Sequence, residues 1–232
     1  MEIQTGIAKI DRFSSQEEGD KVELIERPKG GLSIILAEGK LSGHRSRALT
    51  LKVVHNLLTL ISEGIHDGAA SRAVLNAIMD EHGGKAEVGL SLISCDLETQ
   101  TIVITKNNFN PVVIIRQDQI DFLPLSEESK DCIINDPSVY QFQMEKDLTF
   151  VVISDGVFMA GQQNEQQLDL RTSIDSMLED NLPTVQEMAD LLLNQAIQLD
   201  AGRPKDDMTV IVFRIAANST EDIRRISVQY PI

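Results

Sequence analysis

Six short apolar runs follow one another between residues 88 and 153, and the segments that join them are too short for helical crossovers. The runs lie near residues 88–95, 101–105, 111–115, 119–123, 138–144 and 148–153. Parallel strands need a crossover of a dozen or more residues, so this spacing favours antiparallel pairing over a parallel sheet. An antiparallel β structure therefore dominates the middle of the chain.

The flanking segments add strands at both ends and helices in two blocks. Strand periodicity predicts further strands at 3–11, 20–27, 32–37 and 208–215. Helical spacing of apolar residues predicts helices at 46–61, 69–81, 165–178 and 184–199, and a short one after Ser219. Thr184 and Glu187 have capping-box spacing, and Gly202 closes the last long helix. The pattern predicts an α+β layered domain, with sheets packed together and helices on their outer faces.

Length and composition bound the class of protein. With 232 residues, of which 42% are hydrophobic, the chain suits one domain over 1–232. Its net charge of −15 argues against nucleic acid as a partner. The amino terminus lacks a signal-peptide pattern and no apolar run approaches a membrane span, so we expect a cytoplasmic protein with no membrane partner. Cys95 and Cys132 lack metal or redox spacing and are interpreted as reduced, buried thiols.

Acidic residues border three of the predicted strands. Glu38-Gly39 and Asp155-Gly156 follow two of them, and Asp206-Asp207 precedes the last. Carboxylates held at strand ends supply the oxygen ligands that Mg²⁺ and Mn²⁺ prefer. Each acidic-Gly pair taken alone is more typical of a plain turn, so the hypothesis of a metal site depends on the pairs occurring together.

The glycine loop after Glu38 opens into a predicted helix, and a helix amino terminus can bind anions. His44, Arg45 and Arg47 at this point are compatible with phosphate binding, or with a solvent-exposed helix start and surface ion pairs. The polar stretch 162–167 is compatible with a flap over the site or with a solvated loop.

Four motifs in this order resemble a known family. They are Glu18-Gly19-Asp20, Leu36 to Gly43 (LAEGKLSG), Ile153-Ser154-Asp155-Gly156 and Lys205 to Val210 (KDDMTV). This order resembles the metal-dependent protein phosphatase (PPM) superfamily, and within it the bacterial SpoIIE and RsbX branch of serine phosphatases. The resemblance covers residues 5–216, with 217–232 as a carboxy-terminal tail. It implies a four-layer α-β-β-α sandwich, with two antiparallel sheets flanked by helices and two Mn²⁺ or Mg²⁺ ions at one edge.

The resemblance also implies roles for individual residues. Glu38 would bridge the two ions, the carbonyl of Gly39 would bind one, and Asp155 and Asp206 would complete the other. Asp20 would support the site through metal-bound water, and Asp207 would have a secondary role. Glu38, Asp155 and Asp206 would thus be catalytic, because a metal-bridging hydroxide attacks the phosphoserine or phosphothreonine directly.

The chain departs from the family pattern at two places. Glu38 stands where the family usually has Asp, and its extra methylene moves the carboxylate by roughly 1.5 Å. Asn107-Asn108-Phe109-Asn110-Pro111 stands where the branch commonly has Ala-Gly-His-Xaa-Pro, so the His is absent.

The sequence thus predicts a metal-dependent serine/threonine phosphatase that acts on a phosphorylated regulatory protein in bacterial stress signalling. An anti-sigma antagonist or a stressosome-type component is the expected partner. The alternative, which Glu38 favours, is a catalytically impaired phosphatase-like module that binds a protein or a metal. A generic acidic binding module would leave the ordered motifs unexplained.

Overall fold

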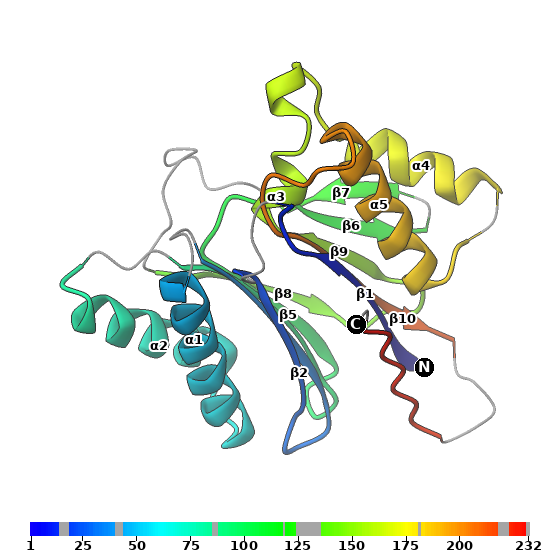
Figure 1. Cartoon of the computed structure of the whole chain (residues 1–232). Helices are drawn as coiled ribbons and strands as arrows, with labels where there is room; N and C mark the ends of the chain where they lie inside the picture. Colours follow the sequence, from blue (N-terminus) through cyan, green and yellow to red (C-terminus); the bar gives the residue numbers. More distant parts are fainter. Residues whose placement is uncertain are drawn as a thin grey trace.

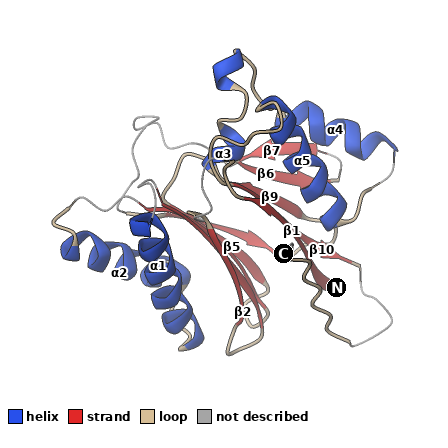
Figure 2. Ribbon diagram, viewed as in Figure 1, coloured by secondary structure: helices blue, strands red, loops and turns tan. Residues whose placement is uncertain are grey.

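Two antiparallel sheets lie face to face in the computed structural model, and helices cover the outer face of each (Figures 1 and 2). The structure describes residues 1–13, 19–39, 44–84, 88–117, 119–123, 136–180, 182–217 and 223–230. The predicted α+β class and the four-layer α-β-β-α sandwich are confirmed. No helix in these described ranges is long and apolar enough to cross a bilayer.

In the described residues, ten strands build the two sheets. They are β1 Glu2–Ile10, β2 Lys21–Glu26, β3 Gly31–Gly39, β4 Val88–Asp96, β5 Thr101–Lys106, β6 Val112–Arg116, β7 Gln119–Phe122, β8 Ser138–Gln143, β9 Thr149–Ile153 and β10 Met208–Ala216. The first sheet has the order β1-β10-β9-β6-β7 and the second the order β2-β3-β4-β5-β8. Neighbouring strands pair antiparallel throughout, as the short connections predict.

The part of the chain that the structure describes has five α-helices, which lie outside the two sheets. They are α1 His44–Ser62, α2 Asp67–Glu81, α3 Asp155–Phe158, α4 Leu170–Asp180 and α5 Val185–Leu199. Helices α1 and α2 pack on the second sheet, whereas α5 packs on β1 and β10 of the first sheet and contacts α4. Gly6 permits this approach, because a Cβ there would lie 2.4 Å from the backbone of Val185.

Three apolar layers hold the sandwich together. Successive residues of a strand point to opposite faces of its sheet. In β9, Phe150 and Val152 therefore lie between the two sheets, while Val151 and Ile153 contact the helical layer. Burial on both faces explains why these strands read as continuous apolar runs, and each large side chain contributes about 1.5–3 kcal/mol.

The expected helix ends differ from the observed ones in one block. A helix was predicted over 165–178, but a 3₁₀ turn at Gln162–Asn164 comes first and α4 begins at Leu170. Gly161 and Glu165 flank that turn with φ of 81° and 56°, and such left-handed residues interrupt a helix. The capping box of Thr184 and Glu187 on α5 is confirmed.

The carboxy-terminal prediction is partly outside the described residues. Gly202 adopts a φ of 74° after α5 and donates its N–H to Ile197, as a helix stop does. The short helix expected after Ser219 falls partly on residues 218–222, which are not described. Residues 223–230 contain no helix or strand.

Candidate functional site

Four acidic residues reach one edge of the sandwich from different parts of the chain. Glu38 is the second-to-last residue of β3, and Asp20 immediately precedes β2. Asp155 begins α3 directly after β9, and Asp206 lies two residues before β10. Glu38 and Asp20 are only 3% and 4% exposed, so the edge holds two carboxyl groups that are almost completely removed from water.

The charge of Asp155 links the four residues. Burial and then the negative charge of Asp155 raise the pKa of Glu38 and that of Asp20 well above their usual values. The pKa of the more exposed Asp206 is also raised, by loss of surrounding water and then by Asp155. Buried carboxylates that repel one another favour protonation or a bound cation.

The carboxylate of Glu38 accepts four hydrogen bonds. Its Oε1 accepts from the amide nitrogens of Asn108 at 2.9 Å and Asn110 at 3.2 Å. Its Oε2 accepts from the same Asn110 nitrogen at 2.9 Å and from the backbone N–H of Asp155 at 2.6 Å. A carboxylate has about four lone-pair positions, so Glu38 is fully satisfied as the ionised group.

The longer side chain of Glu38 has room because its neighbour across the sheet is a glycine. Glu38 pairs with Gly89 in the β3–β4 register. A Cβ on Gly89 would lie 3.2 Å from Oε1 of Glu38, which is tighter than ordinary van der Waals contact. Gly89 therefore accommodates the side chain that departs from the family pattern.

Asp20 and Asp207 have different tasks in the structure. The Oδ2 of Asp20 accepts a hydrogen bond from the hydroxyl of Thr209 at 2.9 Å. Asp207 accepts from the backbone N–H groups of Arg12 at 2.9 Å, Gly19, and Asp20 at 3.0 Å. Asp207 thus fixes the connection that carries Asp20.

Gly39 and Gly156 are places of close approach. The carbonyl of Gly39 accepts a hydrogen bond from the hydroxyl of Ser46 in α1 at 3.0 Å. A Cβ on Gly156 would lie 2.1 Å from the backbone oxygen of Asp207. Only glycine allows α3 to begin this close to β10, and this contact brings Asp155 beside Asp206 and Asp207.

The donor set fits a hard divalent cation. The side chains of Asp20, Glu38, Asp155 and Asp206 and the carbonyl of Gly39 all offer oxygens, the ligands that Mg²⁺ and Mn²⁺ prefer. Within the described ranges, no three Asp, Glu, His or Cys side chains are gathered closely enough to hold an ion as they stand. A cation therefore requires that side chains turn toward it, and Glu38 would have to exchange hydrogen bonds for coordination.

Several expected residues lie elsewhere or outside the description. Residues 40–43, Glu18, Cys132 and the side chains of His44 and Arg45 are outside the described part of the chain, and Arg47 is exposed. The stretch 162–167 forms the 3₁₀ turn and an exposed loop. Cys95 is buried, as predicted, and burial raises the pKa of its thiol to about 12, which makes it a poor nucleophile.

The sequence did not reveal the partners of the acidic residues. Asn108, Asn110, Thr209 and Gly89 contact Glu38 or Asp20, and Lys106 donates to the carbonyl of Asn110. The one available signal was the replacement of the His-containing segment by an asparagine-rich one. That change was visible in the sequence, but its contact with Glu38 depends on strand pairing across the sheet.

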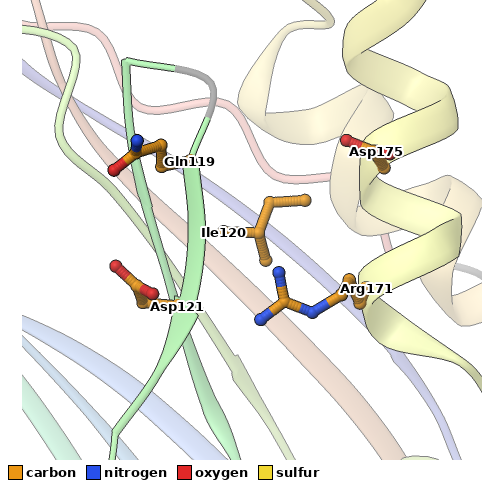
Figure 3. A pocket seen from close by; sticks show the side chains of 5 residues that line it. All are labelled: Gln119, Ile120, Asp121, Arg171 and Asp175. Carbon is orange, nitrogen blue, oxygen red and sulfur yellow. The ribbon is translucent and has the colours of Figure 1, made fainter.

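A separate hollow of about 340 Å³ lies between β7 and α4, and it contains none of the acidic site (Figure 3). It is lined by Gln119, Ile120, Asp121, Arg171 and Asp175. The guanidinium of Arg171 lies 5.3 Å from the ring centroid of Phe122, so a cation–π contact joins α4 to β7 beside this hollow.

Comparisons with solved structures show the same fold. The PP2C phosphatase domain of SpoIIE from Bacillus subtilis, solved with a fragment of its regulatory domain, superposes with a TM-score of 0.76 at 23% identity. That match covers 94% of this chain and 64% of the other. RsbX in complex with magnesium superposes with a TM-score of 0.67 at 15% identity, over 92% of this chain and 96% of that one.

This fold and a match to a family model together identify the chain as a member of the PPM superfamily, in the SpoIIE and RsbX-like branch. The family model for Stage II sporulation protein E (SpoIIE) matches residues 28–216, and the chain belongs to this family. Stage II sporulation protein E of Priestia megaterium is 24% identical over 225 residues, which cover 94% of this chain. The chain spans only 37% of the length of that relative.

Proposed function

We propose that the chain is a single phosphatase domain that removes phosphate from phosphoserine or phosphothreonine on a bacterial regulatory protein, using two Mn²⁺ or Mg²⁺ ions. The convergence of Asp20, Glu38, Asp155 and Asp206 on one edge carries this proposal. Without a compensating charge, such a group of carboxylates is costly to bury. Membership of the SpoIIE family and the magnesium-bound RsbX structure support the same conclusion.

The residues of the chain divide the work between them. Asp155, Asp206 and Glu38, with the carbonyl of Gly39, would hold the ions, and Asp20 would act through water. Bound cations would lower the pKa of a coordinated water and neutralise charge on the phosphoryl oxygens. Thr209 orients the carboxylate of Asp20, and Asp207 holds the backbone on which Asp20 lies. These contacts fix the acidic groups before a substrate arrives.

We infer the class of protein substrate from the family of this chain and not from a feature of its surface. A phosphorylated anti-sigma antagonist or a stressosome-type protein is the substrate that we propose. Charge gives a further restriction: the net charge of −15 disfavours nucleic acid and strongly acidic partners at low ionic strength.

A second candidate function is a phosphatase-like module that has lost catalysis and binds a protein or a metal. The hydrogen bonds of Glu38 favour this second function. The side-chain amides of Asn108 and Asn110 and the backbone N–H of Asp155 already donate to the carboxylate oxygens that metal ions would need. Glu38 also stands where the family usually has Asp, so its carboxylate lies farther from the backbone than an Asp carboxylate would.

Release of phosphate from a phosphoserine protein at millimolar Mn²⁺ separates the two candidates. We expect release by the unmodified protein. If that protein releases none while Glu38→Asp does, the impaired module is the correct account. If neither releases phosphate from a panel of phosphoserine and phosphothreonine proteins, the proposed catalytic function is wrong.

A further inference from the structure

The connection between β5 and β6 supplies most of the groups that hold Glu38. It contains Asn107, Asn108 and Asn110, in the segment where the resembling branch commonly has a histidine. Asn110 is buried and Asn108 is half-buried. Side chains of this kind, brought against a buried carboxylate, act as hydrogen-bond donors that favour its ionised form.

Asn108 and Asn110 together form what we call the amide clamp. Asn110 donates one amide nitrogen to both oxygens of Glu38, at 3.2 and 2.9 Å, and Asn108 donates to Oε1 at 2.9 Å. The backbone N–H of Asp155 supplies the fourth hydrogen bond. All lone-pair positions of the carboxylate are therefore in use.

Further contacts hold the amide clamp in place. Asn107 accepts from the backbone N–H of Leu90 at 2.6 Å and donates to the carbonyl of Val88 at 2.9 Å, so it ties the connection to β4. Asn108 also contacts the hydroxyl of Ser91 at 3.0 Å, and Lys106 donates to the carbonyl of Asn110. The clamp is thus a fixed part of the sheet edge.

We propose that the amide clamp competes with divalent cations for the carboxylate of Glu38. This inference rests on the proposed function, since it concerns the same acidic edge. A cation that binds directly to either oxygen must replace at least one of the clamp's hydrogen bonds. Asn108 and Asn110 are therefore positioning residues that stabilise the metal-free protein and weaken the binding of the ion that Glu38 ligates.

The direction of the effect follows from linkage. A contact that exists only in the metal-free state opposes metal binding by its own free energy, and removing it strengthens binding by the same amount. The same removal leaves a buried carboxylate with fewer donors, so the metal-free protein loses stability. Weaker metal-free stability together with stronger metal binding is a combination that a merely structural role would not produce.

The test is calorimetric titration of the full chain with Mn²⁺, combined with thermal melting in EDTA. We expect Asn108→Ala/Asn110→Ala to melt at a lower temperature in EDTA, and to bind Mn²⁺ about tenfold more tightly, the equivalent of one net hydrogen bond. Ser33→Ala is the control: Ser33 is buried near the opposite end of β3 from Glu38, and the substitution removes its hydrogen bonds to Ser94 and Arg27. It should lower the melting temperature with little change in Kd.

The single variant Asn108→Ala keeps the test decisive if the double variant does not fold, and it should show a smaller shift in the same direction. If the unmodified protein binds Mn²⁺ and the clamp variants have an unchanged or larger Kd, the amide clamp does not compete with the cation. The proposed function is then unaffected. No Mn²⁺ binding by any of the proteins overturns both.

Discussion

The backbone N–H of Asp155 donates to Oε2 of Glu38 at 2.6 Å, although the two residues are 117 positions apart in the chain. This hydrogen bond joins the end of β9 to the end of β3, and so it connects the two sheets at the acidic edge. It also places the side chain of Asp155 where its charge acts on Asp20, Glu38 and Asp206. Asp155 is therefore the residue on which the proposed site depends most.

Asp155→Asn should abolish Mn²⁺-dependent phosphate release from a phosphoserine protein, with a loss of about a hundredfold or more in kcat. The substitution keeps the size of the side chain and its backbone N–H while removing the negative charge. Asp175→Asn, at an exposed position on α4, is the control and should retain full activity. Equal activity of the two variants would show that Asp155 is not part of the catalytic site.

The sequence predicted the layers of this fold well because strand periodicity and short connections are local signals. Glu38 and Asp155 were identified because each follows an apolar run that becomes a strand with both faces buried. The start of α4 was misplaced because the left-handed Glu165 has no sequence signal as clear as a glycine. The contacts of Asn110 with Glu38 depend on the pairing of β3 with β4 and of β4 with β5, which no local pattern reveals.

Metal-free protein should lose stability as the pH rises above about 4. Unfolded Asp and Glu have pKa values of about 3.9 and 4.3, whereas the pKa values of Asp20 and Glu38 are raised in the fold. At a pH between the unfolded pKa of each group and its raised pKa in the fold, the folded state holds a proton that the unfolded state has lost. The free energy of unfolding therefore falls with increasing pH. Urea unfolding in EDTA from pH 4 to 8 measures this slope. The unfolding free energy of Glu38→Gln should fall less steeply with pH than that of the unmodified protein. An identical slope would show that Glu38 does not contribute to it.

Lys106 should produce the opposite trend at alkaline pH. Burial lowers its pKa to about 8, against about 10.4 in the unfolded chain. Between these values the unfolded state holds the extra proton, so the free energy of unfolding should rise as the pH increases from about 8 to 10. Lys106→Met removes the titrating group, and its unfolding free energy should lack this rise. A rise of the same size in the variant would assign it to other groups.

Gly156→Ala should destabilise the protein by about 1–3 kcal/mol, the usual cost of overpacking. The added Cβ would lie 2.1 Å from the backbone oxygen of Asp207, so α3 would have to move away from β10 and take Asp155 with it. Urea midpoints report the stability, and phosphate release reports the displacement of Asp155. Gly68→Ala is the control, because its Cβ would meet only the exposed side chain of Val139. Equal, small effects would mean that the close approach at Gly156 is not required.

In the function that we propose, carboxylates from distant parts of the chain form one divalent-metal site. Anomalous diffraction from crystals soaked in Mn²⁺ tests it directly. We predict manganese density within about 2.2 Å of carboxylate oxygens of Asp155 and Asp206, and its loss in Asp155→Asn crystals. Absence of anomalous density at this edge at saturating Mn²⁺, or density that persists unchanged in Asp155→Asn, would contradict the account.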